Sequence, residues 1–224
     1  MTWAADSMKK DNQVVEKAGL KGKLIIISAP SGAGKSTVIQ KLLKKSKNIA
    51  FSVSYTTRDI RTGEKDGADY HFITREAFDK MAKQGKFLEW AVVHKNYYGT
   101  SKDDTRELLE SGVDVLLDID VQGARQVSKR PFDCVKIFIL PPDREALIQR
   151  LKKRGGLDEE QMNVRLKSAL RELKRAAEYD YIILNDNVKM TVESLESIIL
   201  SEKMKIGYNK ILLRQVIDSF SNGE

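Results

Sequence analysis

The feature that most constrains this chain is a glycine-rich loop between a strand-like run and a helix-like run. The loop matches the pattern G-x-x-x-x-G-K-[ST] of phosphate-binding loops, except that Ala29 stands where the first glycine belongs. Apolar residues fill positions 24–27 before it, and apolar side chains recur at helical spacing after it. We therefore expect the loop to bind a nucleoside triphosphate. Its residues are Ala29, Pro30, Ser31, Gly32, Ala33, Gly34, Lys35, Ser36 and Thr37.

Each part of this loop has an expected task. Gly32 and Gly34 let the backbone curl, so that its N–H groups converge on a phosphate at the positive end of the next helix. The Lys35 ammonium should reach the β- and γ-phosphates, and the Ser36 hydroxyl should bind Mg²⁺. The loop alone does not define the reaction that follows.

A GTPase is one alternative, because Asp120 begins a D-x-x-G tetrapeptide like that of a switch region. We reject it, because the chain has no N-K-x-D tetrapeptide to read guanine: the Asn-Lys pair at 209–210 is followed by Ile-Leu. Asp118 and Asp120 instead follow a predicted strand at the sheet edge where open α/β folds bind ligands. One aspartate can hold the water shell of the metal while the other faces a second substrate.

Strand-like and helix-like segments alternate through most of the chain, which predicts an α/β fold with a parallel sheet and helices on both faces. The stretch at about 51–98 differs, with short strand-like pieces, glycines in a polar turn and one helix near 75–84; we expect an inserted subdomain there. Strands are expected at 24–27, 113–119, 135–140 and 181–184, and helices at 123–128, 143–154, about 158–178 and after 188.

Charge and cysteine content narrow the class of protein. The formal net charge of +7 suits nucleic acid or a small polyanion, but the basic residues are interspersed with acidic ones and most should be solvated surface. The single cysteine, Cys134, makes no intrachain disulfide, which argues for a reducing compartment. The apolar runs are too short to span a bilayer. We expect a cytoplasmic protein that binds neither nucleic acid nor membranes.

Five stretches outside the loop form a second, more specific pattern. They are Ser52-Val53-Ser54-Tyr55-Thr56-Thr57-Arg58, RTGEKDGADY at 61–70, Phe87-Leu88-Glu89-Trp90, Asn96-Tyr97-Tyr98-Gly99 and Leu117-Asp118-Ile119-Asp120-Val121-Gln122-Gly123. With the loop, they resemble the guanylate kinase family of P-loop nucleoside monophosphate kinases over residues 22–200. The resemblance implies a P-loop three-layer α/β/α core with a parallel sheet, an inserted GMP-binding α+β subdomain and a mobile lid.

The resemblance also implies boundaries. A loosely held extension at 1–20 would precede a guanylate-kinase-like domain at 21–219, followed by a tail at 220–224. Within the domain, the core would comprise about 21–50 and 101–219, the GMP-binding insertion about 51–100 and the lid about 150–168.

For the acceptor, the resemblance implies a GMP site with two parts. Arg58, Arg61 and Tyr70 would bind the phosphate with Ser54 and Tyr98 nearby, because guanidinium groups offer planar, charged donors to a phosphate dianion. The carboxylates of Glu89 and Asp120 would accept from the N1–H and amino group of guanine, and the hydroxyls of Thr100 and Ser54 could contact its O6 edge. We also expect Trp90 to pack beneath the guanine pocket.

For the transfer itself, the resemblance implies that Lys35, Arg58 and three lid arginines, Arg150, Arg154 and Arg165, act on the phosphoryl group, with Gly155-Gly156 allowing the lid to close. ATP would be the donor, with Mg²⁺ held by Ser36 and by Asp118 through water. Asn185 would lie on the adenine side, although an Asn-Asp turn is equally suited to capping a helix. On the expected 158–178 helix, the spacing of four apolar residues predicts that they are core: Met162, Leu166, Leu170 and Leu173.

The expected reaction is transfer of the γ-phosphoryl of ATP to GMP or dGMP, giving ADP and GDP or dGDP, with no obligatory protein partner. Two other readings stay open. One is a non-catalytic interaction module that uses the GMP site for a peptide; the intact Lys35, Ser36 and lid arginines speak against it. The other is a phosphorylated sugar as acceptor, which would not need Glu89 and Asp120 as a pair.

Overall fold

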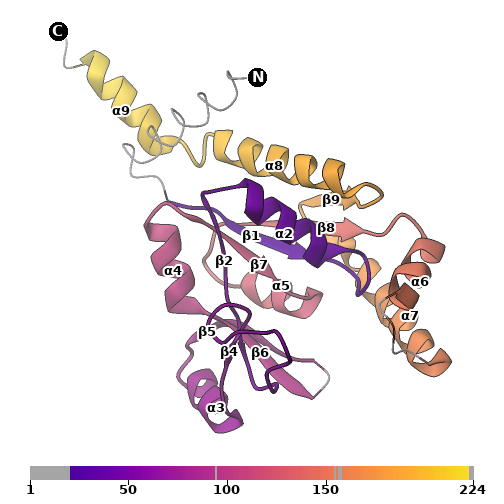
Figure 1. Ribbon diagram of the computed structural model, residues 1–224. Helices are drawn as coiled ribbons and strands as arrows, with labels where there is room; N and C mark the ends of the chain where they lie inside the picture. Colours follow the sequence, from indigo (N-terminus) through magenta and orange to yellow (C-terminus); the bar gives the residue numbers. More distant parts are fainter. Residues whose placement is uncertain (1–20, 94, 154, 156–157, 222–224) are drawn as a thin grey trace.

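The computed structural model describes residues 21–93, 95–153, 155 and 158–221, which form a sheet-centred core with a smaller insertion beside it (Figure 1). The strands of the core are β1 (Leu24–Ser28), β2 (Ile49–Phe51), β7 (Asp114–Asp118), β8 (Cys134–Leu140) and β9 (Tyr181–Leu184). Its helices are α2 (Lys35–Lys45), α4 (Lys102–Glu110), α5 (Val121–Val127), α6 (Arg144–Lys153), α7 (Glu159–Leu173), η1 (Ala176–Glu178) and α8 (Val188–Met204). The last helix, α9 (Lys210–Ser221), buries no residue and extends away from the core (Figure 1).

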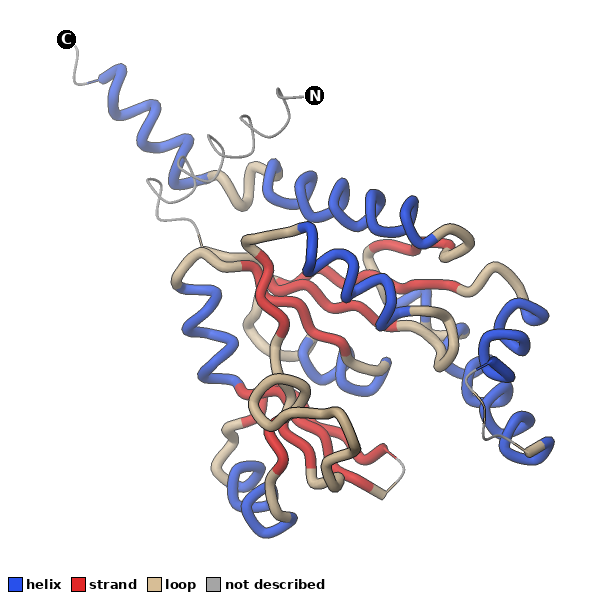
Figure 2. The backbone as a smooth tube through the Cα atoms, in the orientation of Figure 1, coloured by secondary structure: helices blue, strands red, loops and turns tan. Residues whose placement is uncertain are grey.

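The core sheet has the order β2-β7-β1-β8-β9, and every pairing in it is parallel. This confirms the predicted parallel sheet and the four predicted strands. The edge strand β2 was not predicted, because its three residues are too few to show a periodicity. Since parallel strands need crossover connections, helices cover both faces of the sheet (Figure 2).

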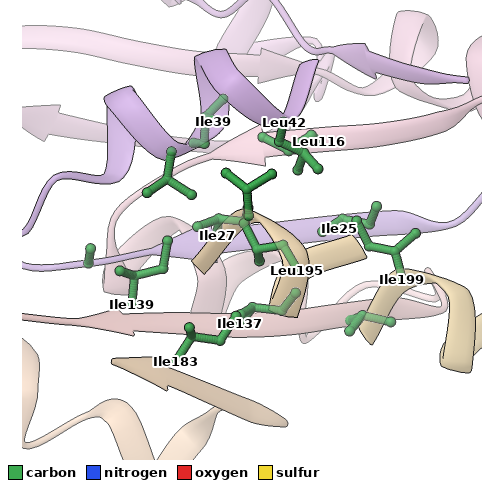
Figure 3. Packing of buried hydrophobic residues seen from close by; sticks show 14 of the residues in the cluster. Ile25, Ile27, Ile39, Leu42, Leu116, Ile137, Ile139, Ile183, Leu195 and Ile199 are labelled. Atoms are coloured by element: carbon green, nitrogen blue, oxygen red, sulfur yellow. The ribbon is translucent and has the colours of Figure 1, made fainter. Parts of the chain in front are cut away.

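Two apolar clusters on opposite faces hold the three layers together. Ile25 and Ile27 of β1 point to the face covered by α2 and α8, where they pack with Leu42 and Leu195 (Figure 3). The alternate residues of β1 point to the other face, against α4 and α5. Because side chains alternate along a strand, an apolar run such as 24–27 is buried on both faces.

The insertion is a small α+β unit. Its sheet has the order β4-β3-β6-β5, with β5 and β6 forming an antiparallel hairpin, and its helix α3 buries Phe78 against Phe87. Its elements are β3 (Tyr55–Thr56), β4 (His71–Phe72), α3 (Arg75–Lys83), β5 (Phe87–Val93) and β6 (Asn96–Ser101).

Two local predictions were wrong. The helix expected at about 158–178 ends at Leu173 and is followed by the short 3₁₀ helix η1, and Leu170 is 56% exposed rather than core. Only part of that helix packs inward, where Met162 and Leu166 contact the small cluster of Leu147, Leu151 and Ala169. The spacing was helical, but the apolar packing of the helix is confined to Leu147 and Leu151 of α6, so its buried side is narrow.

Candidate active site

The phosphate loop connects β1 to α2 in a conformation that requires its glycines. Gly32 and Gly34 have φ angles of 92° and 93°, in the left-handed region that disfavours side chains. Space is also missing: a Cβ on Gly34 would lie 2.5 Å from Nδ2 of Asn185, and one on Gly32 would lie 2.9 Å from Leu151. The loop is therefore pressed against the end of β9 and against α6.

Arg150 and Asn185 hold the loop from outside. The Arg150 guanidinium donates to the carbonyl of Ala33 at 3.0 Å and to the carbonyl of Asn185 at 2.9 Å. The Asn185 amide donates to the same Ala33 carbonyl at 2.7 Å, and Thr191 donates to Oδ1 of Asn185 at 3.0 Å. One loop carbonyl thus accepts hydrogen bonds from two side chains, which fixes the loop to α6 and to the end of β9.

The charged groups at the start of α2 lie at the carboxyl end of β7. The Lys35 ammonium forms an ion pair with the Asp118 carboxylate, and both side chains are partly exposed in the cavity. Ser36 lies beside them at the rim. From α7, the Arg165 guanidinium donates to the Ser31 hydroxyl at 3.2 Å. The phosphate loop, the carboxyl end of β7 and α7 are therefore close together in the site.

A cavity of about 1030 Å³ joins the loop to the insertion and to α6 and α7. Of the residues expected in the site, those that line it are Ala29, Pro30, Ser31, Gly32, Gly34, Lys35, Ser36, Thr37, Ser54, Tyr70, Glu89, Tyr98, Asp118, Asp120, Arg150, Arg165 and Asn185. Segments far apart in the sequence therefore share one space, which is large enough for two nucleotides at its ends.

Four expected residues do not line this cavity. Ala33 turns its carbonyl to Arg150 and Asn185, and Thr100 is fully buried behind Glu89. Arg58 and Arg61 are also absent from the lining of the cavity. Arg154 lies outside the described residues.

Arg58 is held firmly by its neighbours. Its guanidinium donates two hydrogen bonds to the Glu64 carboxylate, at 2.7 and 2.9 Å, and one to the carbonyl of Asp59 at 2.7 Å. It also lies 5.5 Å from the ring centre of Tyr70. Arg61 is exposed, and its backbone N–H donates to the same Glu64 at 2.9 Å. Glu64 therefore binds the side chain of Arg58 and the backbone of Arg61. The sequence analysis did not single out Glu64, although a carboxylate three residues after Arg61 could have indicated this contact.

The two carboxylates of the acceptor side come from different parts of the fold. Glu89 lies on β5, and its Oε1 accepts a hydrogen bond from the Thr100 hydroxyl at 2.7 Å. Burial raises the pKa of Glu89 to about 7, the Thr100 bond lowers it in part, and the nearby Asp120 raises it further. Asp120 caps α5, because its Oδ1 accepts from the N–H groups of Gln122 and Gly123 at 3.0 and 2.8 Å.

Trp90, which we expect beneath the guanine pocket, does not line the cavity. It follows Glu89 on β5, so its side chain points to the opposite face of the strand. There it is 40% exposed and stacks on Tyr97, with the ring centres 5.9 Å apart.

The helix α7 contributes residues that the sequence interpretation missed. Ser168, Arg171 and Glu172 follow Arg165 at intervals of three and four, so one side of the helix faces the cavity. Burial raises the pKa of Glu172 above its usual range, while the Ser168 hydroxyl, 3.1 Å away, lowers it in part. Helical spacing from Arg165 was the signal that could have found them.

Metal binding is limited by the donors available. Among the described residues, no group of three or more His, Cys, Asp or Glu side chains could hold a metal ion by itself. Ser36 and Asp118 supply one hydroxyl and one carboxylate in the cavity, which fits Mg²⁺, since this ion takes few protein oxygens and completes its shell with phosphates and water.

No helix in the described ranges is long and apolar enough to cross a membrane.

A parallel α/β sheet with a phosphate loop at its carboxyl edge, an acid-lined insertion and an arginine-bearing helix pair defines a nucleotide-dependent phosphotransferase of the nucleoside monophosphate kinase class. The family model "Guanylate kinase" matches residues 21–202. The chain therefore belongs to the guanylate kinase family, whose reaction is the phosphorylation of GMP by ATP.

Individual relatives agree over nearly their whole length. The chain is 45% identical over 202 residues to a guanylate kinase of Caldanaerobacter subterraneus subsp. tengcongensis, covering 90% of this chain and 97% of the relative. It is 45% identical over 201 residues to that of Carboxydothermus hydrogenoformans, covering 88% and 98%. The crystal structure of guanylate kinase from Anaplasma phagocytophilum matches with a TM-score of 0.69 and 34% identity, over 87% of this chain and 96% of that one.

Proposed function

We propose that this chain transfers the γ-phosphoryl group of ATP to GMP or dGMP, giving ADP and GDP or dGDP, in purine nucleotide metabolism in the cytoplasm. The observation that carries the proposal is the cavity of about 1030 Å³, which is lined both by the phosphate loop and by Glu89 and Asp120. Family membership supports the same reaction.

ATP binds at the loop side. The loop N–H groups and the Lys35 ammonium bind its phosphates, and Asn185 borders the adenine. Ser36, and Asp118 through water, would hold Mg²⁺, which would neutralise charge on the phosphate oxygens. The Asp118 carboxylate forms an ion pair with the Lys35 ammonium. This ion pair positions the Lys35 cation before the ATP phosphates bind.

GMP binds at the insertion side. Guanine presents two neighbouring donors, N1–H and the amino group, and the carboxylates of Glu89 and Asp120 accept from them; adenine lacks this pair of donors. Arg58, Arg61 and Tyr70 bind the GMP phosphate, with Ser54 and Tyr98 beside it. Thr100 acts through Glu89, because its hydroxyl already donates to that carboxylate.

The chemistry of the step needs alignment and charge rather than a strong base. An in-line phosphoryl transfer spreads negative charge over the equatorial oxygens, and fixed cations stabilise that charge. Lys35 and Arg165 lie at the loop, and Arg150 holds the loop in place while facing the same cavity. Arg154 is proposed to join them from the lid at 150–168, which closes over both substrates and excludes water.

A steady-state assay tests this proposal. Purified protein should form ADP rapidly with ATP and either GMP or dGMP, and hardly at all with AMP, CMP or a sugar phosphate. Lys35→Ala should lower kcat by roughly a thousandfold, since it removes the cation on the transferred phosphoryl group. The matched control is Lys41→Ala, an exposed lysine on the same helix. ADP formation with AMP but not GMP would overturn the acceptor, and a fully active Lys35→Ala would overturn the site.

A further inference from the structure

The helix α5 is the element that connects the two carboxylates proposed to read guanine. Glu89 belongs to the insertion and Asp120 to the core, so their separation depends on how these two parts are joined. Asp120 is the N-cap of α5, with Oδ1 committed to the Gln122 and Gly123 N–H groups. The position of α5 therefore determines where the Asp120 carboxylate lies.

Glu89 rests directly on the same helix. A Cβ added to Gly123 would lie 2.7 Å from Oε2 of Glu89 and 3.2 Å from its Cδ. No side chain other than hydrogen fits at this position while Glu89 keeps its place. The Thr100 bond holds the other oxygen of the carboxylate from the opposite side.

One turn further along α5, Gln126 is bonded to the backbone next to Glu89. Its amide N–H donates to the Trp90 carbonyl at 2.7 Å, and its amide oxygen accepts from the Trp90 N–H at 3.2 Å. The strand β5 is at the edge of its sheet, and this pair of backbone groups is satisfied by the glutamine instead of by another strand. The Gln126 side chain, which belongs to the core, therefore makes the two hydrogen bonds to Trp90 that a neighbouring strand would otherwise make.

We propose that Gln126 is a positioning residue for base specificity: by clamping Trp90 to α5, it sets the separation of Glu89 and Asp120 that matches the two adjacent donors of guanine. The inference rests on the proposed acceptor, GMP. Asp120 is the N-cap of this seven-residue helix, and Gly123 and Gln126 follow it at intervals of three, so both carboxylates are positioned against α5. A loosened clamp would still allow one carboxylate to meet guanine, but not both at once.

The test compares GMP with inosine monophosphate, whose base has the N1–H but lacks the amino group. Gln126→Met keeps the approximate volume and removes both hydrogen bonds. It should raise the KM for GMP roughly tenfold, lower the preference for GMP over inosine monophosphate by a similar factor, and leave the KM for ATP unchanged. Arg125→Ala, at the exposed neighbouring position, should change none of these.

A second variant reports on the same geometry from another side. Gly123→Ala places a methyl group against Glu89 and should also lower the preference for GMP over inosine monophosphate. If Gln126→Met does not fold, Gln126→Glu, which keeps the acceptor for the Trp90 N–H but loses the donor, replaces it with the same expected result.

The outcomes are distinguishable. A lower melting temperature for Gln126→Met with an unchanged preference for GMP over inosine monophosphate would make the residue merely structural and overturn the inference. An equal rise of KM for GMP and ATP would also overturn it. Wild-type protein that does not phosphorylate GMP would instead overturn the proposed function.

Discussion

The hydroxyl of Thr100 donates to the carboxylate of Glu89 across the β5–β6 hairpin, where the two residues are directly paired. Thr100→Val keeps the shape of the side chain but removes the donor, leaving a buried carboxylate oxygen without its partner. We expect the KM for GMP to rise roughly tenfold, from the loss of a hydrogen bond to a charged group. Thr100→Ser keeps the hydroxyl and is the control. Equal GMP kinetics for the valine and serine variants would contradict the role of the bond.

Binding of GMP should depend on pH through Glu89. Its pKa is raised by burial from 4.5 to about 7, so its carboxylate is charged mainly above pH 7. Because guanine needs the charged acceptor, affinity for GMP should fall roughly tenfold between pH 8 and pH 6, measured by calorimetric titration. The phosphate of GMP also titrates near pH 6, so Glu89→Gln is the control and should bind weakly with a flatter profile. An identical profile for both proteins would exclude Glu89 as the source.

The same shift has a consequence for the free protein. A carboxyl whose pKa is higher folded than unfolded binds more protons in the folded state between these two values. The contribution of Glu89 to the free energy of unfolding is therefore present below pH 4.5 and is lost as pH rises towards 7. The difference in free energy of unfolding between wild type and Glu89→Gln, from urea titrations at pH 5 and pH 8, should favour the variant more at pH 8. The opposite sign would show that folding lowers the pKa of Glu89 instead of raising it.

Arg150 is expected to act on ATP through the loop. Arg150→Lys cannot donate to the Ala33 and Asn185 carbonyls at once, so the loop loses a brace. We expect the KM for ATP to rise roughly tenfold and the free energy of unfolding to fall by about 1–2 kcal/mol. Lys152→Ala, an exposed neighbour on α6, should behave as wild type. An unchanged KM for ATP in Arg150→Lys would show that the loop holds its conformation without this residue.

Asp118 should matter for the metal and for Lys35 together. Asp118→Asn keeps the size but removes the charge that pairs with Lys35, so kcat should fall roughly a hundredfold. The variant should also need more Mg²⁺ for half-maximal rate, measured by titrating the metal at saturating ATP and GMP. Glu107→Gln, exposed on α4, serves as the control. A lower kcat with an unaltered Mg²⁺ requirement would confine Asp118 to its contact with Lys35.

The α8 layer is expected to stabilise the fold without touching the site. Leu195 is fully buried against the core sheet, whereas Leu200 on the same helix is 47% exposed. Leu195→Ala should lower the free energy of unfolding by about 2–5 kcal/mol, and Leu200→Ala by much less. Urea denaturation of both variants measures this difference. Equal losses would mean that α8 is not packed on the sheet as described.

Local sequence patterns were enough to predict much of this fold. The apolar run at 24–27, the loop after it and the spacing of residues in α2 and α8 each depend on neighbours in the chain, and the structure has them where they were expected. The same reasoning was wrong for Leu170, which is exposed. Helical spacing says which side of a helix a residue occupies, but not what that side contacts.

By itself, the sequence determined a parallel α/β fold with a phosphate loop, because strand and helix periodicity and the strain that only glycine tolerates are properties of short segments. Only the tertiary structure decided that Arg150 holds the Ala33 carbonyl, that Glu64 holds Arg58, and that Gln126 fastens β5 to α5. These contacts join residues whose approach depends on how the helices pack on the sheet and on how the insertion meets the core. A hydrogen bond depends on distances of a few tenths of an ångström, which no spacing along the chain specifies.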